Sequence, residues 1–87
     1  MKFHYEPPLY SAATGLKTEW EKDFTIEVGI VNGEVLLQAN RGGLITLAKH
    51  LLTLAQDGVP PGTHIHYSAG MELEPGCAEL ILEVLKD

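Results

Sequence analysis

The sequence has a single cysteine, Cys77, and only six lysine and arginine residues among its 87 positions. One cysteine excludes a disulfide within the chain, so no crosslink supports the small core, as is usual in a reducing compartment. Twelve carboxylates against six cations give a net charge of −6. We therefore expect neither nucleic acid nor an anionic membrane as a partner, because both require clustered cations. The acidity either suits a basic protein partner or simply keeps a small protein soluble.

Long hydrophobic runs are also absent. No apolar stretch approaches the roughly 20 residues of a membrane-spanning helix, and residues 1–6 lack the apolar segment of a signal peptide. We therefore expect a cytoplasmic protein. The chain is long enough for one domain, residues 1–87, because two cores of half this size would be too small. With 45% of its residues apolar, it can fill one core.

Residues 1–23 predict an irregular N-terminal segment, and residues 24–39 predict a β-hairpin. Apolar and polar side chains alternate along residues 24–31, and residues 34–39 form the return strand. Asn32 and Gly33 lie between them, and this dipeptide favours a two-residue type I′ turn. Such a turn pairs apolar with apolar and polar with polar residues: Ile30 with Val35, Val28 with Leu37, and Glu27 with Gln38.

A helix is predicted from about Gly43 to Asp57. Asn40 is suited to cap its start, and Gly58, followed by two prolines, is suited to end it. Apolar residues recur at helical spacing and predict one buried stripe. That stripe consists of Leu44, Leu47, Ala48, Leu51, Leu52 and Ala55.

Two further strands are predicted, at residues 63–69 and 78–86. The second could also be read as a helix because it is rich in Glu and Leu, but its alternation and the preceding Pro75 and Gly76 favour a strand. The predicted fold class is therefore α+β, with the order strand, strand, helix, strand, strand over residues 24–87. We expect one four-stranded antiparallel or mixed sheet with the helix on one face.

His64 and His66 are the residues most suggestive of chemistry. Their spacing of two along a strand places both imidazoles on one face, within reach of one metal ion. A third ligand would have to come from residues such as Cys77, Glu79 or Glu83, and none has a diagnostic spacing. Two histidines on a polar strand face are more often only solvated. We therefore predict no metal and no cofactor, and no sequence motif indicates a catalytic residue.

The outer face of the predicted sheet is the candidate surface for a partner. It would combine polar and acidic residues with a few apolar ones, which suits a protein interface. Alternatively, the N-terminal segment covers its apolar part. Trp20 is a further candidate, because a tryptophan among charges either packs over the core edge or anchors a partner. The candidate contact residues are Glu27, Gln38, His64, His66, Glu79, Glu83 and Trp20.

Residues 35–84 resemble a known family. The resemblance rests on Val35 to Leu37, on Gly43, Leu44, Leu47 and Ala48 at the helix start, on Gly62, His64 and His66, and on the run from Leu73 to Leu80. In these motifs the chain resembles the small immunity proteins of bacterial polymorphic toxin systems, of the type called immunity protein thirty-two. The resemblance implies that the protein neutralises a cognate toxin by direct binding, and it implies no catalytic residue.

The leading hypothesis is therefore a small acidic binding protein that is not an enzyme, whose partner is a cognate protein toxin of basic character. One alternative is a small metal- or ligand-binding domain that uses His64 and His66. Another is a structural module that forms homodimers or larger homo-oligomers through an exposed sheet edge.

Overall fold

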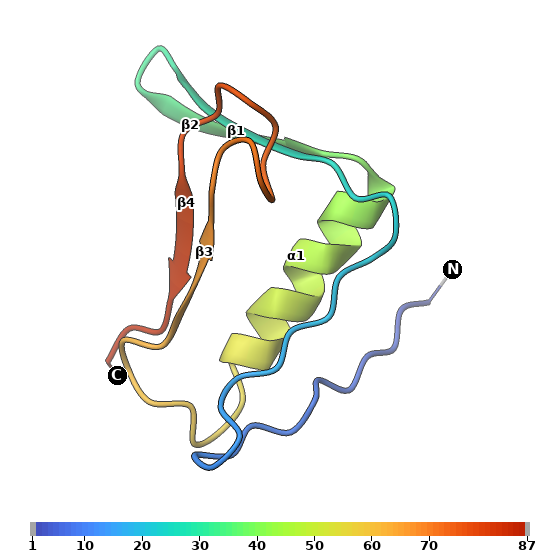
Figure 1. The fold of residues 1–87 in the computed structure, drawn as a ribbon, viewed down its shortest axis with the longest axis vertical. Coiled ribbons are helices and arrows are strands. Elements are labelled where there is room, and N and C mark those ends of the chain that lie inside the picture. The colour runs from blue at the N-terminus through green and yellow to red at the C-terminus, as the bar shows by residue number, and fades with distance from the viewer. Residues whose placement is uncertain (1, 87) are drawn as a thin grey trace.

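The structure is a computed structural model that describes residues 2–86, and it combines one helix with two small antiparallel sheets (Figure 1). The fold class and the order of elements agree with the sequence prediction. The elements are β1 (Ile26–Val31), β2 (Glu34–Ala39), α1 (Arg41–Leu54), β3 (His64–Tyr67) and β4 (Leu80–Glu83). Within residues 2–86, no helix is both long and apolar enough to cross a membrane.

The first hairpin has the predicted register. Its residues pair as Ile30 with Val35, Val28 with Leu37, and Glu27 with Gln38. Asn32 and Gly33 have φ angles of 53° and 78°, which are the positive values that a type I′ turn requires. The local turn chemistry and the alternation of side chains therefore agree, and together they determine this hairpin.

The predicted single four-stranded sheet is wrong. β1 pairs with β2 and β3 with β4, and the two pairs form separate sheets in the described part of the chain. The outer edge of β1 is instead covered by the loop before β4. The N–H groups of Glu74 and Ala78 donate to the carbonyls of Ile26 and Val28 at 3.1 and 2.9 Å. This loop takes the position that a third strand would need, and the second hairpin descends away from the first (Figure 1).

Asn40 joins the start of α1 to the segment before β1. Its side-chain oxygen accepts hydrogen bonds from the N–H groups of Gly43 (2.7 Å) and Thr25 (2.9 Å), and its amide donates to the carbonyl of Asp23. The predicted N-cap is therefore confirmed. The helix ends at Leu54, earlier than expected, where the N–H of Ala55 still bonds to the carbonyl of Leu51.

The buried face of α1 differs from the predicted stripe. Of the six predicted stripe residues only Leu47 is buried, and the other five are exposed. The buried residues still follow helical spacing, but half of them are polar: Gly43, Thr46, Leu47, His50, Thr53 and Leu54. This face can be buried because its polar side chains have hydrogen-bond partners. Apolar periodicity alone favoured the neighbouring face, since it takes no account of such partners.

Residues 2–25 run along α1 (Figure 1), and the backbone at Glu19 and Glu21 bonds to the partly polar face of the helix. We call residues 5–21 of this segment the strap. Gln56 accepts a hydrogen bond from the N–H of Tyr10 and donates one to the carbonyl of Pro8. Further up the helix, Thr46 accepts from the N–H of Glu21 at 2.9 Å. The irregular N-terminal segment is thus held by side chains of the helix region. The core forms where the same face of α1 meets the hairpins, and it consists of Ile26, Val28, Leu47, Tyr67 and Leu73.

Truncating Leu47 and Leu51 separates the buried face from the exposed one. We expect Leu47→Ala to lower the free energy of unfolding by about 2–5 kcal/mol, because it leaves a cavity in the core. The matched variant Leu51→Ala, on the exposed face of the same helix, should cost less than about 1 kcal/mol. Urea unfolding followed by circular dichroism measures both. Equal losses for the two variants would contradict the assignment of the buried face.

Candidate functional site

Two histidine–carboxylate pairs cross the outward face of β3 and β4. The Nε2–H of His66 donates to Glu79 Oε1 at 2.8 Å. The Nδ1 of His64 lies 3.9 Å from Glu83 Oε1 and donates to the carbonyl of Gly62 at 3.0 Å. Ile81 lies directly opposite His66 in the register. We call these five residues, His64, His66, Glu79, Ile81 and Glu83, the His–Glu face.

This face is outward because alternate residues of the same hairpin fill the interior. Tyr67 is fully buried, and Ile65, Leu80 and Leu82 pack against the core. The sequence prediction that both histidines share one strand face with Glu79 and Glu83 is therefore consistent with the pairing of β3 with β4. Side-chain pairs as exposed as these contribute at most about 1 kcal/mol to stability. Their side chains can therefore change partners at little cost to the fold.

A groove with a mixed polar and apolar lining lies beside the His–Glu face, between the end of α1 and β4. It has a volume of about 670 Å³, and its lining combines apolar side chains, among them Leu51 and Leu85, with the polar ones of Gln56, Asp57 and Glu83. The groove brings the exposed side chains of Leu51 and Leu85 next to the carboxylate of Glu83 in β4. A surface that mixes apolar and polar groups in this way is common in protein–protein interfaces that are not obligate.

The other predicted contact residues lie elsewhere. Glu27 and Gln38 face each other on the first hairpin, which is a different sheet from the His–Glu face. The ring of Trp20 lies 5.0 Å from that of Phe24 and 4.4 Å from that of His50. It packs over the edge of the core, and 37% of its surface stays exposed. The predicted sites thus form three groups rather than one surface.

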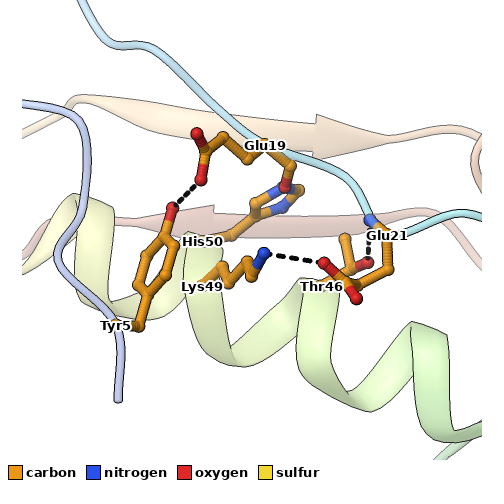
Figure 2. A network of polar contacts seen from close by, with 6 residues as sticks. All are labelled: Tyr5, Glu19, Glu21, Thr46, Lys49 and His50. Atoms are coloured by element: carbon orange, nitrogen blue, oxygen red, sulfur yellow. Dashed lines mark hydrogen bonds and ion pairs between the residues drawn. The ribbon is translucent and has the colours of Figure 1, made fainter. Parts of the chain in front are cut away.

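A buried polar network, which the sequence did not reveal, ties the strap to α1 (Figure 2). His50 is fully buried, and its Nε2 lies 2.9 Å from the carbonyl of Glu19. Since a carbonyl only accepts, Nε2 carries the proton, and Nδ1 accepts from the hydroxyl of Tyr67 at 2.6 Å. A signal was present, because His50 follows Gly43, Thr46 and Leu47 at the spacing of one helix face.

The charged ends of the network lie nearer the surface (Figure 2). Lys49 Nζ is 2.7 Å from Glu21 Oε2, and the hydroxyl of Tyr5 donates to Glu19 Oε1 at 2.7 Å. The hydrogen bond to Glu21 raises the pKa of Lys49. Burial, followed by the hydrogen bond to Glu19, raises the pKa of Tyr5. Lys49 therefore stays charged and Tyr5 neutral near pH 7, and both hold the strap.

The titratable groups at the centre of the network are kept neutral. Burial lowers the pKa of His50, because no carboxylate compensates its charged form there. Burial, and then the charge of Glu72, raises the pKa of Tyr67. We therefore assign His50 and Tyr67 a structural role. Over residues 2–86, no group of three or more His, Cys, Asp or Glu side chains is placed to hold a metal ion.

Comparison with known families gives the remaining observation. The family model described as Immunity protein 32 matches residues 34–85, more than half of the chain. The chain belongs to the Immunity protein 32 family. The resemblance seen in the sequence is thus confirmed, and the match extends from β2 to the end of β4. No curated protein and no solved structure matches the chain.

His50 predicts how stability depends on pH. Its pKa is about 6.5 when unfolded and lower when folded, so the unfolded state binds more protons just below pH 6.5. Above about pH 6.5, we expect His50 to make the free energy of unfolding neither rise nor fall with pH. Below it, stability should fall by up to about 1.4 kcal/mol per pH unit until the folded pKa is reached.

The variant His50→Gln removes this titration and serves as the comparison. The pKa of Glu72 is lowered, mainly by the hydrogen bond from the N–H of Ser68. The stability that Glu72 contributes is lost only below about pH 4.3, so it does not overlap with the titration of His50. Urea unfolding at several values between pH 5.5 and 7.5 measures the slope. A variant with the same slope as the natural protein would show that His50 is not the responsible group.

Proposed function

We propose that this protein neutralises a cognate bacterial toxin by binding it directly, and that it catalyses no reaction. The observation that carries the proposal is membership of the Immunity protein 32 family. The pairing would take place in the bacterial cytoplasm, where a cell that makes a toxin needs protection from it. Binding the folded toxin tightly is sufficient for neutralisation, because a covered active site is closed to its substrate.

The surface we propose for the toxin is the His–Glu face together with the adjacent groove. Glu79 and Glu83 supply negative charge on a chain that already carries a net charge of −6. A basic toxin surface would be attracted to them over a distance, which speeds association. Leu51 and Leu85, which are 54% and 85% exposed in the groove, supply the apolar contact that charges alone do not provide.

The histidine–glutamate pairs of the His–Glu face allow a cation of the toxin to take the place of a histidine. Glu79 is held by His66 at 2.8 Å, and both side chains are about half exposed. A lysine or arginine of the toxin can replace the histidine beside the carboxylate, and a bidentate arginine makes the stronger contact. The carboxylate of Glu79 is thus held in position before binding, which lowers the entropic cost of ordering it.

The function itself is tested with candidate toxins, beginning with the product of any toxin gene that neighbours this one. Co-expression should restore growth of cells that the toxin arrests, and purified protein should bind purified toxin at a one-to-one ratio of chains and abolish its activity in proportion. Restored growth without a physical complex would contradict direct binding. Failure of both assays with the neighbouring toxin would remove the proposal.

The proposed surface is tested by charge reversal. Glu79→Lys with Glu83→Lys should slow association with the toxin at least tenfold at low salt and reduce the dependence of the rate on salt. The matched control, Glu6→Lys with Glu34→Lys, changes the net charge equally but lies away from the face, and its effect should be smaller. Both should unfold within about 0.5 kcal/mol of the natural protein. Equal rates for the two variants would place the interface elsewhere.

A further inference from the structure

The free edge of β2 is a second surface that the function above does not use. In a hairpin with a two-residue turn, Val31 and Glu34 bond to each other, so residues 34, 36 and 38 direct their backbone groups toward β1. Val35 and Leu37 then direct theirs away from it. The opposite edge agrees, because the carbonyls of Ile26 and Val28 point away from β2 and accept from the loop before β4.

The two edges of this sheet therefore differ. Protein backbone covers the edge of β1, whereas all residues of β2 except the last are exposed. Edge strands are normally protected by lysine, proline or a bulge. β2 has none of these, and its middle residues, Val35, Leu36 and Leu37, are apolar. Val35 is 72% exposed and Leu36 44% exposed, so both faces of the strand are apolar and open.

Two antiparallel copies of β2 have complementary side chains. An antiparallel pairing of two copies about Leu36 places Leu36 opposite Leu36 and Val35 opposite Leu37 of the second copy. Glu34 then lies opposite Gln38, whose amide can donate to the carboxylate. Apolar residues meet apolar and polar residues meet polar ones, which is the condition for a well-defined register. Val35 and Leu37 also carry the outward backbone groups, so this register forms backbone hydrogen bonds as well.

Charge does not oppose this pairing at the edge itself. Glu34 is the only charged residue of β2, and the two copies of Glu34 would lie at opposite ends of the paired strands. Four residues at about 3.4 Å each separate them by about 14 Å, which exceeds the screening length of about 8 Å at physiological salt. The apolar face of the hairpin would also continue across the junction, because Ile30, 70% exposed, shares a face with Val35 and Leu37.

We propose that a second copy of the chain pairs antiparallel with β2, about a two-fold axis at Leu36. The dimer contains one four-stranded sheet in the order β1, β2, β2 of the second copy and β1 of the second copy. The strand contact is short, so the dimer is weaker than an obligate one and depends on protein concentration. The His–Glu face lies on the other sheet, and this inference does not rest on the proposed function.

A charge swap at Leu36 tests both the dimer and its register. Sedimentation of the free protein from low micromolar to near-millimolar concentration should show a monomer–dimer equilibrium. Leu36→Lys places two like charges opposite each other and should weaken self-association at least tenfold, as should Leu36→Glu. An equal mixture of the two variants should recover dimerisation, because opposite charges then meet. The matched control Val31→Lys, on the same face but in β1, should keep more of the natural self-association.

A second variant keeps the test decisive if changes at Leu36 disturb the hairpin. Val35→Pro removes an outward N–H and leaves the bonds to β1 in place, so it should give a folded monomer by circular dichroism and sedimentation. A natural protein that stays monomeric at every concentration would overturn the proposal, as would variants that dimerise unchanged. A monomer whose β2 amides become protected only when toxin is added would assign the edge to a toxin strand instead.

Discussion

The hydrogen bonds of His50 join three parts of the molecule: the strap, α1 and β3. Its Nε2–H donates to the strap at Glu19, and its Nδ1 accepts from Tyr67 in β3. Trp20 closes the site, with its ring 4.4 Å from the imidazole. Because the two hairpins do not pair as one sheet, the position of β3 and β4 depends on the shared core and on the bonds between β1 and the loop before β4. The His–Glu face is held in place from the inside by Tyr67, and Tyr67 is held by His50.

The parts of the fold that could be predicted from the sequence are those set by neighbouring residues. Asn32 and Gly33 determine a turn, the turn determines a register, and Asn40 caps the helix that follows. The contact between the hairpins was wrongly predicted, because the loop at Glu74 and Ala78 bonds to β1 through backbone groups that carry no sequence signal. The prediction of the buried helix face was wrong for a related reason. Thr46 and His50 are buried with hydrogen-bond partners that are distant in the sequence, at least 25 residues from Thr46 and at least 17 residues from His50. Of the candidate site, the expectation that His64 and His66 share a face with Glu79 and Glu83 followed from alternation. The separation of Glu27 and Gln38 from that face depended on non-local packing.

The two proposed contact surfaces share an origin in the part of the chain that defines the family. The family model matches residues 34–85, which include Leu36 in β2 and all five residues of the His–Glu face. The strap and β1 lie outside the match, and their side chains serve mainly to cover α1 and fill the core. A β2 edge that pairs with a second copy would leave both His–Glu faces free, so one dimer could bind two toxin molecules. Dimerisation would then raise the apparent affinity only for a toxin that is itself multivalent.

Hydrogen exchange of the protein with and without its toxin tests the central claim most directly. Backbone amides report on each segment separately, so the measurement needs no substitution that could disturb the fold. Direct binding at the His–Glu face predicts slower exchange in β3 and β4, at residues 64–67 and 80–83, and unchanged exchange in the strap. Slower exchange confined to the strap or to the exposed side of α1, with β3 and β4 unaffected, would contradict the account.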